Sequence, residues 1–338
     1  MSNITIRKNF YSLSDPEKQA FIDSIVELKK RGRYDQYVVW HAQTMSIMTK
    51  QEDEETGRNA AHRGPIFLPW HRELLRRFEL DLQSINPSVS LPYWKWEAET
   101  NPYQAEIWNW FGGDGDPNEL VRNYDSGEPL GFRVKNGPFS FEKGWTTIET
   151  NDAGNPALPG YPRDRPDFTI PLSSYPRAKL ARAFGKSKEF GGGWDVRSLP
   201  SITDVNSAMS INSYDSNPWD ETSLGFRNAL EEFRPRGLHN QIHVFVFGHM
   251  ILQTSPNDPI FFLNHSNVDR IWAQWQDNRN DDGYPLDGEI MYGNGSRIPS
   301  HNRNDIMIPW NSSSHGNPTI ANVLNYSNLN YKYEVEHK

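Results

Sequence analysis

The sequence predicts a mainly α-helical fold, with a four-helix-bundle core, long loops and a few short strands. Two observations predict it. Apolar residues recur at helical spacing in two groups of segments, between residues 14 and 82 and between 223 and about 275. The stretch between them, 86–218, is rich in Gly and Pro and lacks long periodic runs, which indicates an ordered, loop-rich insertion on a helical body. We expect one domain over residues 1–338, because this length allows a single large core and no linker divides the chain.

Three helices are expected before the insertion. The first begins at Ser14-Asp15-Pro16, where capping side chains precede a helix-entry proline, and it ends at Gly32. The second covers residues 34–49. The third covers residues 69–82, where apolar side chains at helical spacing alternate with Arg and Glu.

Short elements are expected within the insertion and helices again after it. Residues 139–141 and 145–148 are typical of short strands, and short helices are predicted near 177–184 and 202–209. Helices follow over 223–233 and 238–245, and a long one follows Asn257-Asp258-Pro259, with Asp258 as its N-cap and the proline at its first position. Residues 331–333 predict a last strand.

Charge and cysteine content narrow the function. The 35 Lys and Arg residues against 43 Asp and Glu residues give a net charge of −8, so we expect no nucleic-acid partner. The absence of cysteine excludes disulfides, thiolate zinc sites and iron–sulfur clusters, and leaves metal binding to His, Asp or Glu. The N-terminus shows no signal-peptide pattern and no apolar run is long enough to span a bilayer, so we expect a cytoplasmic protein without a membrane partner.

Six of the ten histidines form two groups, one on each side of the insertion. The first group is His41, His62 and His71, and the second is His239, His243 and His265. A spacing of four places His239 and His243 on one face of a helix. Because Trp, Phe and Leu surround these residues, the six imidazoles are expected to be neutral, buried in the bundle core and bound to metal. The histidines at 301, 315 and 337 are expected to be ordinary surface residues.

The donor set limits the metal without fixing it. Imidazole suits copper, zinc, iron and nickel. A carboxylate-bridged di-iron bundle needs paired Glu-x-x-His motifs, and this spacing occurs only at Glu334 and His337. The His-Glu-x-x-His motif of zinc proteases is absent, and no carboxylate accompanies the histidines as in dizinc hydrolases. Three imidazoles per metal leave positions open for a small ligand.

Four stretches of the sequence resemble type 3, binuclear copper proteins, and among them short bacterial-type tyrosinases. They are Ala60-Ala61-His62-Arg63-Gly64 with Phe67-Leu68-Pro69-Trp70-His71-Arg72-Glu73, then Leu238-His239-Asn240-Gln241-Ile242-His243, and then Pro256-Asn257-Asp258-Pro259-Ile260-Phe261-Phe262-Leu263-Asn264-His265. The similarity extends over nearly the whole chain.

The resemblance implies a function and a ligand set. His41, His62 and His71 would bind one copper ion, and His239, His243 and His265 the other. The two copper ions would use dioxygen to hydroxylate small phenols at the ortho position and to oxidise o-diphenols to o-quinones, the chemistry of melanin formation. The resemblance also allows three further features: a helper protein that delivers copper, export of the enzyme with that helper, and a homodimer.

The resemblance further implies roles around the copper ions. Glu231 and Asn240 match a pair that holds a water able to deprotonate a phenol; the alternative for Glu231 is a solvated helix carboxylate. Phe261 matches a ring over the substrate or a ligand imidazole, and core packing is its alternative. Asn264 and Val244 stand where many relatives have His and some have Arg, so the wall of the substrate pocket is expected to differ.

The end of the chain carries one more expectation. Arg7 and the Tyr331-Lys332-Tyr333 segment bracket the chain as in the family core, so we expect a single tyrosinase-like catalytic domain without a C-terminal lid domain. Two alternatives stay open: a catechol or o-aminophenol oxidase with little hydroxylation, and an oxygen binder like haemocyanin.

Overall fold

The computed structural model describes residues 4–231 and 237–335 and confirms a mainly helical chain. Helices of the described residues are α1 Asp15–Lys30, α2 Tyr34–Met45, α3 Phe67–Ile85, α4 Ile107–Phe111, α5 Ile202–Met209, α6 Phe226–Glu231, α7 Leu238–Val246, α8 Ile260–Asp277 and α9 Ala321–Leu324. Strands are β1 Thr5–Arg7, β2 Asp116–Arg122, β3 Pro129–Arg133, β4 Thr147–Ile148, β5 Arg177–Ala178, β6 Ala181–Arg182 and β7 Tyr331–Tyr333. Each predicted long helix is present, with ends shifted by a few residues where the structure describes them; the predicted end of the 223–233 helix lies outside the described residues.

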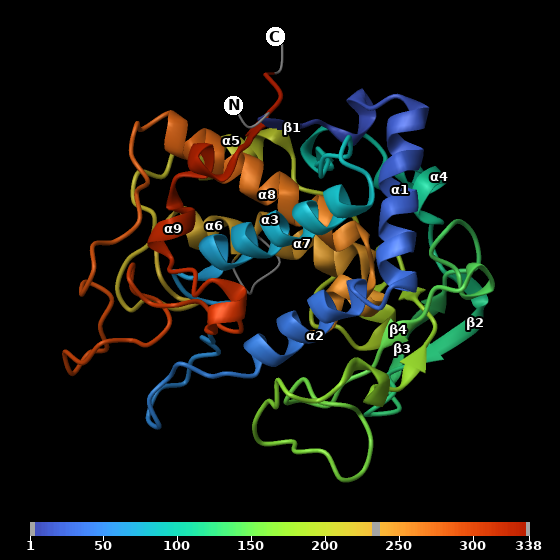
Figure 1. Cartoon of the computed structure of the whole chain (residues 1–338), viewed down its shortest axis with the longest axis horizontal. Coiled ribbons are helices and arrows are strands. Elements are labelled where there is room, and N and C mark those ends of the chain that lie inside the picture. The colour runs from blue at the N-terminus through green and yellow to red at the C-terminus, as the bar shows by residue number, and fades with distance from the viewer. Residues whose placement is uncertain (1–3, 232–236, 336–338) are drawn as a thin grey trace.

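The core is a bundle of α2, α3, α7 and α8. Figure 1 shows α3, α7 and α8 in the middle of the molecule, with α2 below them and α1 along one side. α3 packs against both α1 and α8, and α7 packs against α8. Phe78 of α3 stacks on Phe262 of α8 with ring centroids 3.7 Å apart. Leu74 and Leu75 are fully buried beside Phe78, so the apolar face of α3 is the face that the sequence pattern predicted.

The N-termini of α1 and α8 are stabilised by different contacts. Ser14 and Glu17 form a capping box at α1, as the Ser-Asp-Pro start predicted. α8 begins at Ile260, one residue later than predicted. Asp258 does accept a hydrogen bond from the Ile260 amide at 3.2 Å, but its main partner is the buried guanidinium of Arg182, 2.6 Å away. The carboxylate therefore joins the insertion to the bundle as well as helping to start the helix.

Two predictions for the insertion are wrong. Residues 177–184 form no helix, because β5 pairs with β4 and β6 pairs with β3, so their backbone hydrogen bonds go to strands distant in sequence. Residues 139–141 form no strand; Phe141–Lys143 is a 3-10 turn. The predicted strand at 145–148 is confirmed in its last two residues, and the helix at 202–209 is confirmed as α5.

The two ends of the described chain meet beside the bundle. β1 and β7 pair in parallel, near the top of Figure 1. Arg7 is fully buried there, bonded to Glu79 of α3 at 2.9 Å and to Asp269 of α8 at 3.3 Å. Its guanidinium lies 3.6 Å from the centre of the Tyr331 ring. Removing either carboxylate would leave a buried charge uncompensated, so these contacts fix both ends against the core.

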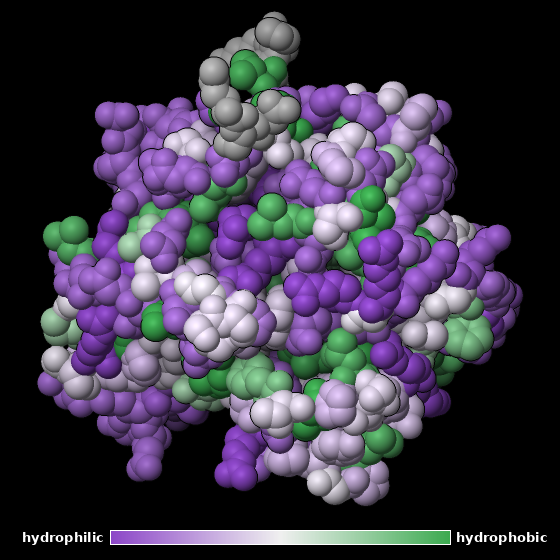
Figure 2. Space-filling model, in the orientation of Figure 1, coloured by the Kyte–Doolittle hydropathy of each residue, from purple (hydrophilic) through white to green (hydrophobic). Residues whose placement is uncertain are grey.

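One face of the molecule is mostly polar (Figure 2). Figure 2 shows hydrophilic residues over most of one face, with hydrophobic side chains in small groups. Among the described helices, none combines the length and the apolar content needed to cross a bilayer.

Candidate metal centre

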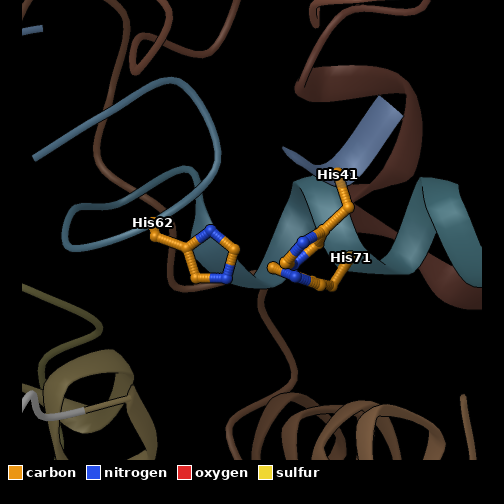
Figure 3. Close-up of side chains that lie close together, drawn as sticks. All are labelled: His41, His62 and His71. Carbon is orange, nitrogen blue, oxygen red and sulfur yellow. The ribbon is translucent and has the colours of Figure 1, made fainter. Parts of the chain in front are cut away.

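The first histidine triad gathers three elements at one point. His41 lies on α2, His71 lies on α3, and His62 lies on the loop between them. All three are buried, and each offers a ring nitrogen within 4.8 Å of those of the other two. Figure 3 shows the three rings turned toward a common centre. The geometry is that of a site with three imidazole donors.

The position of His62 depends on one asparagine. The side-chain oxygen of Asn59 accepts hydrogen bonds from the amide of Ala61 at 3.1 Å and from the amide of His62 at 2.9 Å. Asn59 is itself buried. This turn holds the loop so that His62 faces the two helices.

The second triad comes from two helices. His239 and His243 lie one turn apart on α7, and His265 lies on α8. One ring nitrogen of each again lies within 4.8 Å of the others. The Nε2 atoms of His239 and His265 are 3.0 Å apart. The Nδ1 of His239 donates to the side-chain oxygen of Asn240 at 2.8 Å, which leaves the His239 Nε2 unprotonated.

The two triads adjoin through aromatic contacts. His71 and His265 stack with ring centroids 4.2 Å apart and an interplanar angle of 13°. Phe261 lies 4.1 Å from His265 and 5.1 Å from His41, so it contacts both triads. Phe67 does the same, at 4.8 Å from His71 and 5.0 Å from His239. No role was predicted for Phe67, although its place four residues before His71 puts it on the same helix face.

A cavity of about 350 Å³ opens onto both triads. Two histidines of each triad line it: His41 and His62 from the first, His239 and His243 from the second. Its lining includes the polar residues Arg63, Glu231 and Asn240. Its apolar lining residues are Met45, Trp194, Val244, Met250, Ile251 and Leu252. His71 and His265 do not line this cavity, and their rings stack on each other.

Glu231 is a buried carboxylate at this cavity, only 3% exposed, so it is not a solvated helix residue. It accepts a hydrogen bond from the Arg63 amide at 2.5 Å and one from Arg227 at 3.2 Å. Arg227 also forms a buried pair with Asp215. Burial raises the pKa of Glu231 to about 7, although Arg227 and the Arg63 amide act in the opposite direction.

The predicted pocket residues separate into two groups. Val244 lines the cavity, as does Asn240, which was predicted to hold a water with Glu231. Phe261 and Asn264 are fully buried and are not among its lining residues; Phe261 packs on ligand imidazoles, and both side-chain amide atoms of Asn264 lack a hydrogen-bond partner among the described residues. The expectation for His301 is wrong. It is fully buried between Thr49, which contacts its Nε2 at 3.0 Å, and the Ile66 amide.

The other two histidines expected at the surface are His315 and His337. His315 is half-buried, and position 337 lies outside the described residues.

Comparison with known proteins identifies the family. The family profile "Tyrosinase: Common central domain of tyrosinase" matches residues 31–278, which include all six histidines. A tyrosinase of Streptomyces glaucescens is 35% identical over 316 residues, covering 92% of this chain and 94% of that protein. The chain belongs to the tyrosinase family.

Other relatives agree with this membership. A grixazone synthase of Streptomyces griseus is 35% identical over 81% of this chain and 84% of its own length. Among solved structures, a polyphenol oxidase from Thermothelomyces thermophila has a TM-score of 0.64 at 22% identity, covering 98% of this chain and 89% of that chain. A functional unit of octopus hemocyanin has a TM-score of 0.53 at 18% identity, covering 98% of this chain and 68% of that chain. These two structures show the shared fold.

The tyrosinase family implies a binuclear copper centre, and the residues fit one. Each of His41, His71 and His243 bonds a backbone carbonyl through Nδ1: those of Gln253 at 2.6 Å, Phe67 at 2.8 Å and Met250. Their buried Nε2 atoms have no hydrogen-bond partner among the described residues. Nitrogens left unpaired in this way are donors oriented for a metal ion.

The protonation of the triads supports the same assignment. Burial lowers the pKa of His41 to about 3 and that of His243 to about 4. The pKa values of the other four histidines of the triads lie well below the ordinary value, again mainly because of burial. All six are therefore neutral at pH 7, the form that binds a metal ion. As a member of the family the chain is a type 3 copper enzyme with tyrosinase activity.

Proposed function

We propose that each triad holds one copper ion and that the chain uses dioxygen to hydroxylate monophenols and to oxidise o-diphenols to o-quinones. His41, His62 and His71 hold one ion, and His239, His243 and His265 hold the other. The observation that carries this proposal is the set of unpaired Nε2 atoms on rings whose Nδ1 atoms are fixed by backbone carbonyls. A copper pair in such a site supplies the activation of dioxygen and the transfer of electrons.

The chain's first task is to keep the site dry and rigid. Phe67 and Phe261 pack against imidazoles of both triads, and both rings are fully buried. His71 stacks on His265 with ring centroids 4.2 Å apart. Water and a phenol would reach the two triads through the cavity that the other four histidines line.

The second task is to remove the phenol proton. A phenol has a pKa near 10, so at neutral pH it is protonated and needs a base before its oxygen can bind a metal ion. Glu231 and Asn240 both line the cavity, and the pKa of Glu231 is raised to about 7. We assign to them the binding of one water, through which the Glu231 carboxylate accepts the phenol proton.

The third task is to orient the ring of the substrate. The apolar residues that line the cavity include Val244, Ile251 and Leu252. Trp194 and Ile251 are 41% and 42% exposed, so both lie where the cavity meets the solvent. We infer that small phenols fit this arrangement, with the hydroxyl near Glu231 and Asn240 and the ring against the apolar side chains.

Three further expectations rest on the family resemblance and remain predictions. They are one catalytic domain over residues 1–338, a copper-delivery helper protein and a homodimer.

The test compares initial rates on tyrosine and on L-DOPA, with the lag phase recorded, for the copper-loaded and the metal-free protein. We expect both substrates to be turned over only with copper. Turnover of L-DOPA with tyrosine untouched would favour a catechol oxidase. Reversible oxygen binding without turnover of either would favour an oxygen binder.

A further inference from the structure

Residues 248–255 contact one ligand histidine of each triad through main-chain oxygens. The Met250 carbonyl accepts the Nδ1 proton of His243, and the Gln253 carbonyl accepts that of His41 at 2.6 Å. The two carbonyls are three residues apart in one short segment, which begins with the 3-10 turn Gly248–Ile251. No other described segment bonds to the imidazole Nδ1 atoms of both triads.

These two hydrogen bonds determine the tautomer and the orientation of the His41 and His243 rings. A ring that donates its Nδ1 proton to a fixed carbonyl must present an unprotonated Nε2, and its plane is set by the direction of that bond. The Nε2 atoms of His41 and His243 are the ones left unpaired. A shift of the 248–255 segment would therefore turn one ligand in each triad at the same time.

The segment is held in place by a buried histidine that binds no copper in this assignment. The amide of Ala181 donates to the Nδ1 of His249 at 3.0 Å. His249 therefore carries its proton on Nε2, which donates to Glu149 at 3.3 Å. Thr147 donates its hydroxyl to the same Glu149 oxygen. His249 is fully buried and Glu149 is 4% exposed, so these bonds have no competition from bulk water.

Two further contacts fix the segment to the insertion. The side chain of Gln253 donates to the carbonyl of Asn151 at 2.7 Å. Gly248 has a φ of 62°, and a Cβ there would lie 2.0 Å from the carbonyl oxygen of Ala181. Only glycine allows this close approach of the segment to β6. The insertion thus positions the segment at both ends.

We propose that residues 248–255 couple the two copper sites, and that the His249–Glu149 pair is the positioning pair that holds them. This inference rests on the proposed function in one respect, the assignment of the two triads as copper sites. It predicts that damage to the pair weakens both sites together, although neither residue touches a metal ion.

The experiment compares three variants. In His249→Ala, Glu149 loses its donor and the Ala181 amide loses its acceptor. In His249→Gln, the amide side chain can accept from Ala181 and donate to Glu149. Ile25→Ala removes a fully buried side chain from α1, which carries no ligand, and serves as the control for loss of packing. Copper per chain is measured at equilibrium against a graded copper(I) chelator.

The expected result is a joint shift of both copper ions. In His249→Ala the occupancy should fall from two to zero in one step, at a free copper concentration about 10–100-fold higher than for the unaltered chain, the range known for partners of metal ligands. His249→Gln should recover most of the lost copper affinity, and Ile25→Ala should bind copper like the unaltered chain. A plateau at one copper per chain in His249→Ala would overturn the coupling. Equal losses in His249→Ala and Ile25→Ala, or in His249→Ala and His249→Gln, would overturn the role of the pair.

A copper-free measurement separates this inference from the proposed function. In ¹⁵N-histidine-labelled, metal-free protein, long-range ¹H–¹⁵N spectra report which ring nitrogen carries the proton. His41 and His243 should be protonated at Nδ1 in the unaltered chain and in Ile25→Ala, and should lose this preference together in His249→Ala. If the unaltered chain binds no copper, the proposed function fails while this spectrum still decides the coupling. Unchanged spectra in His249→Ala would contradict it.

Discussion

The two triads reach the same result by different routes. The second takes His239 and His243 from one helix turn, so secondary structure alone sets their spacing. The first needs His62 from a loop, and that loop is shaped by the side chain of Asn59. Two ligands on one helix turn are positioned when the helix forms, with no further loss of conformational entropy. A loop loses additional entropy when it is ordered, so a loop ligand needs polar contacts to remain in place.

The triads also differ in what surrounds them on the cavity side. Asn240 accepts from His239 of the second triad, whereas Glu231 is held by the amide of Arg63, the residue after His62. The proposed base therefore depends on the loop of the first triad. A change in the geometry of this loop should also change proton transfer.

The largest effect should come from removing a single ligand of either triad. The single variants His62→Ala and His243→Ala should each reduce the copper content from two ions to one per chain. Each should also abolish turnover of both substrate classes, because both metal ions act together. Metal analysis and catechol oxidation on the same sample measure this, with circular dichroism as the check of folding. Activity retained in either variant would show that its histidine is not a ligand.

A more selective effect is expected at Glu231. Glu231→Gln keeps the shape of the side chain and removes the base, so the initial rate on a monophenol should fall about 100-fold, within the range for general base catalysis. Oxidation of a catechol should change much less. Equal losses on both substrates would assign Glu231 a structural role only.

The loop of the first triad offers a smaller and asymmetric effect. Asn59→Ala removes the acceptor that shapes the turn at His62, and copper affinity of the first triad should fall about 10-fold while the second triad keeps its ion. Asn123→Ala is the matched control, because Asn123 accepts two amide bonds of the same kind in a turn of the insertion, at 2.9 Å each. Equal affinities in the two variants would remove the distinction between loop and helix ligands.

The smallest effect is a shift in pH dependence. Glu231 is protonated below its raised pKa of about 7 and cannot accept a proton there, so monophenol hydroxylation should rise as the pH increases through about 7. Catechol oxidation should lack this step. Asp215→Asn removes a negative charge that raises the pKa of Glu231, and the midpoint should move to lower pH. A midpoint unchanged by Asp215→Asn would mean that another group controls the profile.

The sequence predicted those parts of the fold whose determinants are local. The bundle helices follow from apolar periodicity, and the capping box of α1 follows from Ser14 and its neighbours. The short strands β5 and β6 could not be predicted, because they are fixed by β4 and β3, which are distant in sequence. A segment of two residues has no periodicity to detect.

The same distinction applies at the site. Spacing placed His239 and His243 on one helix face, and the apolar residues around all six histidines predicted two buried, metal-binding groups. Resemblance to the family then implied that the metal is copper. The burial of His301 could not be predicted, since its neighbours in sequence are polar and its contacts, Thr49 and Ile66, come from the other half of the chain. The carbonyls of Met250 and Gln253 were also missed, because main-chain ligand contacts leave no residue type to recognise.

Both activities are expected to require one binuclear copper site formed by the six histidines. The most direct measurement is metal content after loading, with tyrosine and L-DOPA turnover determined on the same samples across a copper titration. We predict two copper ions per chain and rates that rise with the fraction of chains carrying both ions. Full activity at one copper per chain, or activity in the metal-free protein, would contradict this requirement for both ions.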